Sequence, residues 1–176
     1  MSDHENIHQS KSNEWYTPAP YIEAARRVMG EIDLDPASST FANHIVRAKM
    51  YYAIEDNGLE QNWKGRVWLN PPYGKTNNKS NQGIWLRKLI GEFSESAVTQ
   101  AILLVNAMPS EDWFAPLWKF PICFTNHRIK FIDKYGNAQK NPTHGNCFVY
   151  LGSGIDRFVW QFSAFGHVVQ DLRRGV

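Results

Sequence analysis

The chain has 176 residues, of which 43% are apolar and 14% aromatic, so a fully disordered chain is excluded and one domain with a substantial core is expected. No apolar run reaches the 18 residues that a membrane span needs, and two cysteines are too few for a disulfide framework. The net charge of +2 hides an asymmetry, because residues 1–60 carry a net −5 and residues 61–176 a net +7, and a basic half favours a polyanionic partner.

The chain starts with a polar segment, residues 1–13, which is expected to be a flexible tail without a secretory signal. One domain is expected to follow, over residues 14–176. Its first helix is predicted at Pro18, because apolar residues recur near helical spacing after this position. Thr17 is the expected N-cap of this helix, and Gly30 is the expected C-cap.

Strands and helices then alternate as far as about residue 120. Short apolar segments predict strands at residues 32–35, 49–53, 66–69 and 101–105. A brief helix is predicted at residues 39–46, between two of these strands. Apolar residues at helical spacing predict a helix at residues 86–93, and Ser110 is expected to cap a further short helix. Such alternation is typical of a parallel sheet, and the run at 101–105 indicates a strand buried on both faces.

The last third of the chain is richer in strands. These are predicted at residues 122–124, 128–132 and 147–151, ahead of a helix at residues 155–165. The last two strands flank a loop and form an antiparallel hairpin in this interpretation. The expected fold is therefore α/β, a mostly parallel sheet with an antiparallel hairpin at one edge. Ligands of such a sheet bind beyond the carboxyl ends of its strands, where Asp35-Pro36 and Asn70-Pro71 are expected to face one crevice.

The strongest chemical signal is Asn70-Pro71-Pro72-Tyr73, which directly follows an apolar strand segment. Two prolines remove two backbone N–H groups and end the strand in a rigid turn. The Asn70 side chain and the Pro71 carbonyl can then accept hydrogen bonds from one planar NH2 group, which makes its nitrogen a better nucleophile toward a methyl sulfonium. Tyr73 offers an aromatic face on which a base can stack after it leaves a duplex. The alternative is a tight loop that only ends a strand.

Four segments together resemble phage-type DNA N6-adenine methyltransferases, the Dam-like phage family. They are EWYTP at 14–18, IDLDPAS at 32–38, WLNPPYG at 68–74 and RIKF at 128–131, the last followed by a Gly-containing hairpin. The resemblance implies a single Rossmann-like methyltransferase domain, S-adenosylmethionine as methyl donor and adenine in double-stranded DNA as acceptor. It also implies a cytoplasmic enzyme encoded by a phage or prophage, with Asn70, Pro71, Pro72 and Tyr73 as the catalytic motif.

The resemblance implies a set of cofactor contacts around the first strand. Asp35 pairs with the positively charged amino-acid end of the cofactor in this interpretation, and Asp33 is a weaker candidate. The family usually has a glycine-rich loop after this strand, whereas this chain has Pro36-Ala37-Ser38. The expected cofactor contacts are Trp15, Tyr16, Thr17, Pro18, Asp33, Asp35, Pro36, Ala37, Ser38, Asp56 and Asn70. A turn carboxylate at Asp35, an ordinary helix start at Thr17 and an Asx turn at Asp56 are the structural alternatives.

Contacts to DNA are expected from two basic, polar segments. The first is residues 74–83, which the composition predicts to be a mobile loop, and the second is the region around residues 125–145. The expected DNA contacts are Lys75, Lys79, Arg128, Lys130 and Lys134. No metal site is expected, because the cysteines and histidines near residues 123–147 do not have the spacing to close on one ion.

Two other functions share parts of this pattern. Protein glutamine N5-methyltransferases also use Asn-Pro-Pro-Tyr on an amide NH2, but they need a helical recognition domain and a glycine-rich first loop that this chain lacks. A noncatalytic nucleic-acid-binding module is the other alternative. The intact Asn70-Pro71-Pro72-Tyr73 beside an intact Asp35 argues against it.

Overall fold

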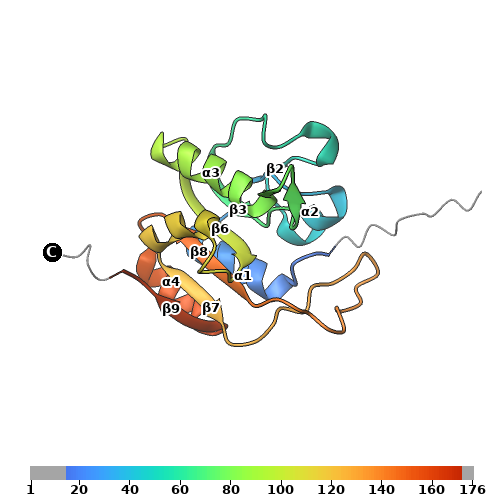
Figure 1. Cartoon of the computed structure of the whole chain (residues 1–176). Helices are drawn as coiled ribbons and strands as arrows, with labels where there is room; N and C mark the ends of the chain where they lie inside the picture. The colour runs from blue at the N-terminus through green and yellow to red at the C-terminus, as the bar shows by residue number, and fades with distance from the viewer. Residues whose placement is uncertain (1–14, 172–176) are drawn as a thin grey trace, which may run out of the picture.

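The computed structural model describes residues 15–171 and consists of one mixed sheet with helices on both faces (Figure 1). The tail predicted at residues 1–13 lies outside the described residues. The main sheet contains β1 (Leu34–Asp35), β2 (Met50–Tyr51), β3 (Gly65–Leu69), β6 (Val98–Asn106), β7 (Ile122–Thr125), β8 (Asn146–Leu151) and β9 (Gly166–Val169). A separate hairpin consists of β4 (Lys75–Thr76) and β5 (Lys79–Ser80).

Four α-helices and two 3-10 segments complete the described chain. They are α1 (Ala19–Met29), α2 (Thr40–Val46), η1 (Ile54–Asp56), α3 (Asn81–Ser94), η2 (Asp112–Lys119) and α4 (Ile155–Phe162). None of these helices is long and apolar enough to cross a membrane.

The strand order is β2-β1-β3-β6-β8-β7-β9, and the direction of pairing changes in its middle. The pairs from β2 to β6 are parallel, and the pairs from β6 to β9 are antiparallel. The predicted α/β class is confirmed, but the antiparallel part comprises three strands rather than one edge hairpin. The prediction of a strand at residues 128–132 is wrong. The backbone there makes only isolated bridges from Ile132 to Tyr16 and Ala138, while Ile129 and Phe131 are buried as side chains.

Successive residues of the central strands point to opposite faces and fill two separate cores. One core packs α1 and α4 against residues such as Ile102 and Phe148. The other packs α3 and η2 against their chain neighbours Leu103 and Val149 (Figure 1). Residues 101–105 are buried throughout, which confirms the prediction of a strand covered on both faces.

The helix ends follow the predictions only in part. Gly30 ends α1 with a φ of 86°, a conformation that costs glycine little. Thr17 does not cap α1, because the helix begins at Ala19 and its N-cap position is Pro18, which has no side-chain acceptor. Ser110 is also not a cap, since η2 starts after Glu111 without any side-chain cap. The Thr17 side chain is instead buried, where it contacts the Asn70 amide described below.

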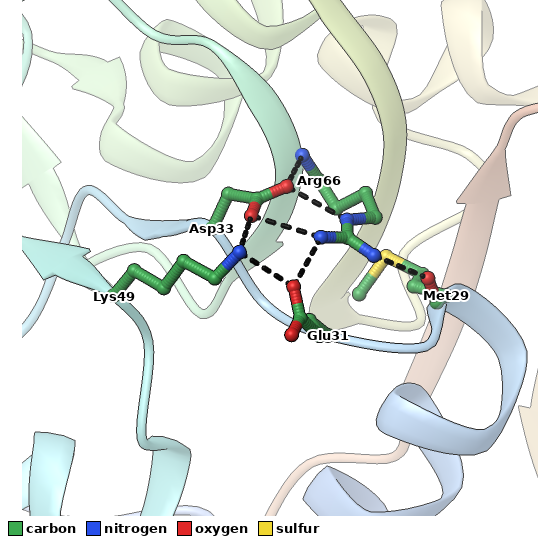
Figure 2. Close-up of polar contacts among 5 residues, drawn as sticks. All are labelled: Met29, Glu31, Asp33, Lys49 and Arg66. Carbon is green, nitrogen blue, oxygen red and sulfur yellow. Dashed lines mark hydrogen bonds and ion pairs between the residues drawn. The ribbon is translucent and has the colours of Figure 1, made fainter.

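An ion-pair cluster joins β1 to β3 on their amino-terminal side, with Arg66 at its centre (Figure 2). Arg66 Nε donates to Asp33 Oδ2 at 2.7 Å, and its Nη2 donates to Glu31 Oε2 at 2.6 Å. Lys49 Nζ adds a second cation 3.1 Å from Asp33 Oδ1. The hydrogen bond from Arg66 holds the pKa of Asp33 well below its usual range. The Asp33 carboxylate is therefore engaged in a structural ion-pair cluster at the sheet.

We expect Arg66→Met to lower the free energy of unfolding by about 1–2 kcal/mol, because Asp33 loses its two-pronged partner. The lowered pKa of Asp33 means that this stabilisation is present above the usual carboxyl value of 3.8 and is lost as the pH falls toward the folded value. Denaturant titrations of both proteins at neutral and acid pH measure this difference. Lys49→Met, at the exposed side of the same cluster, is the matched control and should cost clearly less. An equal cost for the two variants would contradict the central role of Arg66.

Candidate active site

The carboxyl ends of β1 and β3 open onto one cavity of about 490 Å³, which we call the Asp35 cavity. Its wall contains Asp35 from the first strand end and Asn70 from the second, so the prediction that both ends face one crevice is confirmed. Of the residues that the sequence singled out, those lining it are Trp15, Tyr16, Thr17, Asp35, Ala37, Ser38, Asn70, Pro71, Pro72 and Tyr73. The chain segments before α1, after β1 and after β3 thus meet at one site.

Four of the expected cofactor contacts do not line this cavity: Pro18, Asp33, Pro36 and Asp56. Pro36 is buried against Gly58, at which an added Cβ would lie 2.0 Å from the Pro36 carbonyl oxygen. Asp56 is exposed, and its Oδ2 accepts a hydrogen bond from Ala53 N at 2.8 Å, a capping contact at the start of η1 rather than the Asx turn of the structural alternative. These side chains shape the loops around the site.

Asp35 is the buried acid of the site, with 2% of its surface exposed. Burial raises its pKa to about 7, against weaker opposing hydrogen bonds from Ser38 and the Ala37 N–H, the latter at 3.4 Å. No Lys or Arg among residues 15–171 forms an ion pair with it. Burying a carboxylate without a cation is costly, so a cationic group of a ligand would be held at this position.

The Asn70 amide is held from two sides. Its Nδ2 donates to Thr17 Oγ1 at 3.4 Å, and its Oδ1 accepts from the Tyr73 hydroxyl at 3.1 Å. Thr17 is 5% exposed, so the segment before α1 helps to orient the amide. The Tyr73 ring remains partly exposed and meets Phe131 edge-on, with 6.3 Å between ring centroids.

A second cavity of about 400 Å³ adjoins the first, and Trp15 and Tyr73 line both. We call it the Gln82 cavity, after a residue in the first turn of α3. Its wall also contains Asn106 at the end of β6 and Asn146 at the start of β8. Gln82 belongs to the 74–83 segment that the sequence predicts to contact DNA, whereas Asn106 and Asn146 were not predicted. Asn106 carried a usable signal, because it ends an apolar strand just as Asn70 does.

A family model described as DNA N-6-adenine-methyltransferase (Dam) matches residues 4–151 of this chain. The chain belongs to the Dam family. It is a DNA N6-adenine methyltransferase, and not the protein glutamine methyltransferase or the noncatalytic module that shared parts of the pattern. Comparison with curated proteins and with solved structures gives no match.

The Dam-family enzyme carries its expected DNA contacts on two segments beside the Gln82 cavity. Lys75 and Lys79 lie on the β4–β5 hairpin, and Lys75 lines the cavity itself. Arg128, Lys130 and Lys134 lie on the connection from β7 to β8, seen as the long orange segment in Figure 1. All five side chains are exposed.

The segment at residues 74–83, predicted to be a mobile loop, forms a hairpin and the start of a helix. Asn77 and Asn78 have positive φ values of 49° and 61°, which suit the tight two-residue turn between β4 and β5. Ser80 then caps α3 by accepting a hydrogen bond from Gly83 N. The asparagines that made the segment look irregular are the residues that this turn needs.

A backbone bridge ties the basic β7–β8 connection to the wall of the Asp35 cavity. Tyr16 N donates to Ile132 O at 2.7 Å, and Ile132 N donates to Tyr16 O at 2.9 Å. The same stretch contributes Phe131 to the Gln82 cavity. The two cavities are therefore framed by common segments of the enzyme.

Neither cysteine lines either cavity. Cys123 belongs to the core beneath α1 and α4, and Cys147 to the core beneath α3. Across residues 15–171, no three His, Cys, Asp or Glu side chains are grouped so that they could hold a metal ion.

Proposed function

We propose that S-adenosylmethionine binds in the Asp35 cavity and that the target adenine enters the Gln82 cavity, with its N6 directed at Asn70. The Dam family implies this methyl donor. The observation that carries the proposal is the shared wall: Tyr73 lines both cavities and its hydroxyl contacts Asn70 Oδ1. A donor in one cavity and an acceptor in the other would meet at this amide.

The Asp35 cavity fits the proposed cofactor in size and charge. Its volume of about 490 Å³ lies within the roughly 300–1,000 Å³ of ligand pockets. Asp35, buried and without a cation partner among the described residues, suits the α-amino group of S-adenosylmethionine. Trp15, Tyr16 and Thr17 also line the cavity. Bound S-adenosylmethionine supplies a methyl group on a positively charged sulfur.

The residues of the motif act on the amino group of the base. Asn70 Oδ1 and the Pro71 carbonyl accept one hydrogen bond each from N6, and this draws its lone pair out of conjugation with the ring. Thr17 Oγ1 accepts from Asn70 Nδ2, which favours the orientation in which Oδ1 is presented to the substrate. Tyr73 gives up its own hydrogen bond to Oδ1 and stacks on the base.

Incubation with S-adenosylmethionine carrying a deuterated methyl group tests the proposed reaction. Duplex DNA digested to nucleosides should contain labelled N6-methyladenine by mass spectrometry. RNA and a protein release factor, incubated in parallel, should take up no label. Label on protein glutamine, or none on DNA in the presence of bound cofactor, would contradict the proposal.

The five basic residues are proposed to contact DNA phosphates, so DNA binding should weaken steeply with salt. Substituting Arg128, Lys130 and Lys134 together by Ala should flatten the slope of log affinity against log salt by about 0.9 for each phosphate that is no longer neutralised. Fluorescence anisotropy over a salt series measures this slope. The matched control replaces Arg27, Lys64 and Arg157, which line neither cavity, by Ala. The same slope in both triple variants would place the interface elsewhere.

A further inference from the structure

We propose that three amide side chains in the Gln82 cavity, those of Gln82, Asn106 and Asn146, read the ring edge of the target base and so select adenine. This proposal rests on the proposed function, since it requires the base to occupy this cavity. It assigns base selection to residues outside Asn70-Pro71-Pro72-Tyr73.

The three amides form one connected cluster. Gln82 Oε1 accepts from Asn106 N at 2.8 Å, and Asn146 Nδ2 donates to Asn106 Oδ1 at 3.3 Å. Asn106 and Asn146 are directly paired across β6 and β8, so the sheet fixes their spacing. Gln82 is 4% exposed and Asn146 is 3% exposed. The cluster is thus rigidly held and nearly enclosed.

The cluster leaves polar atoms without partners. Gln82 Nε2 and Asn106 Nδ2 form no hydrogen bond within the part of the chain that the structure describes. No described side-chain nitrogen or oxygen is fully buried without a partner, so these donors must keep some accessible surface. Both residues line the Gln82 cavity. Asn146 Oδ1, an acceptor, also has no partner among the described residues, and Glu111 adds a carboxylate to the wall. The cavity therefore presents two amide N–H donors together with these acceptors.

These donors match what an adenine offers once its N6 is engaged by Asn70. The remaining polar atoms of the ring, N1, N3 and N7, are all acceptors. Guanine carries an oxygen in place of N6 and a donor at N1. Its N1–H would face an amide N–H of the cavity, and Asn70 would have no amino group to bind. Trp113 and Phe131 in the same wall supply aromatic surface for a planar ring. Asn and Gln side chains are the usual partners of adenine in DNA recognition.

Measuring each protein variant on DNA substrates that contain base analogues tests this assignment. Gln82→Glu keeps the oxygen that accepts from Asn106 N and replaces the free donor by an acceptor. On DNA with a normal target adenine at pH 8, we expect kcat/KM of this variant to fall about tenfold or more. DNA containing 1-deaza-, 3-deaza- or 7-deazaadenine at the target lacks one ring acceptor at a time. The kcat/KM of the wild type should fall by a similar factor on one of these analogues. On that same analogue, the kcat/KM of Gln82→Glu should be little lower than its value on normal adenine.

The controls separate base reading from a structural role. Gln161→Glu makes the same substitution on α4, outside both cavities. Each analogue should lower the kcat/KM of this variant by the same factor as it lowers that of the wild type. Gln82→Met is a second variant, in case Glu disturbs folding, and thermal melts check both. Additive losses for Gln82→Glu on all three analogues, or the same coupling from analogues placed at a flanking base, would overturn the proposal. If the proposed function itself were wrong, cofactor binding or Asn70-dependent methyl transfer would fail even on DNA with normal adenine. This outcome is distinct from failure of the base-reading proposal.

Discussion

Asn70→Ala is expected to reduce the rate of methyl transfer in a single turnover by about 100-fold or more, the scale seen when a preorganised polar contact is removed at a reacting centre. In our proposal, the variant loses the acceptor that activates the adenine amino group. Its affinity for S-adenosylmethionine should stay nearly unchanged, because the cofactor is held chiefly by Asp35 and the segment before α1 in our proposal. Rapid-quench transfer assays and calorimetric titration of the cofactor measure the two quantities separately.

Asn70→Asp is the matched control, since it retains an acceptor oxygen but loses the Nδ2 donor to Thr17. We expect a smaller loss of rate than for Ala. If the Ala variant turned over at the wild-type rate, Asn70 would not be catalytic. If both variants lost cofactor affinity instead of rate, the amide would belong to the cofactor site.

Asp35→Asn is expected to weaken binding of S-adenosylmethionine by tenfold or more at pH 8, because the cationic amino group loses a buried charged partner. In the wild type, burial raises the Asp35 pKa to about 7 in the cofactor-free protein. The ionised form binds the cation, so the affinity should fall as the pH is lowered below 7. The Asn variant should lack this dependence. Unchanged affinity in the variant at pH 8 would move the cofactor site elsewhere.

The stability of the cofactor-free protein should depend on pH in the opposite sense. The folded pKa of Asp35 lies above its unfolded value near 3.8, so the contribution of this group is most favourable below that value. It is lost as the pH rises through about 7. Thermal melts without cofactor should therefore show the stability of Asp35→Asn relative to the wild type rising between about pH 4 and pH 7 and staying constant above pH 7. The absence of such a rise would mean that burial of the carboxylate does not destabilise the folded protein.

The convergence of Asp35 and Asn70 could be predicted from sequence because it depends on two local facts. Each residue ends a short apolar segment, and parallel neighbouring strands bring their carboxyl ends to one edge. The later part of helix α3 could also be predicted, from apolar residues at helical spacing. The motif Asn70-Pro71-Pro72-Tyr73, proposed to be catalytic, is contiguous, so no tertiary information was needed to find it.

The Gln82 cavity could not be predicted, because its amides come from three segments whose contact depends on strand register. Asn106 meets Asn146 only because β8 runs antiparallel to β6 in that register. The alternating apolar residues at 128–132 looked like a strand for a related reason. Ile129 and Phe131 are buried, but against a site rather than in a ladder, and sequence periodicity does not distinguish the two.

The reversal of β8 has a consequence for how this enzyme could acquire new DNA specificity. Both β6 and β7 pair antiparallel with β8. The connection over residues 126–145 therefore leaves the sheet and returns to it beside Asn106, at the carboxyl end of β6. Its two ends are anchored by strand pairing, while most of its length lies outside the two cores. Its tip, residues 134–137, is exposed and lines neither cavity. Insertions and substitutions at this tip would change the surface offered to DNA and leave both cores and both cavities intact.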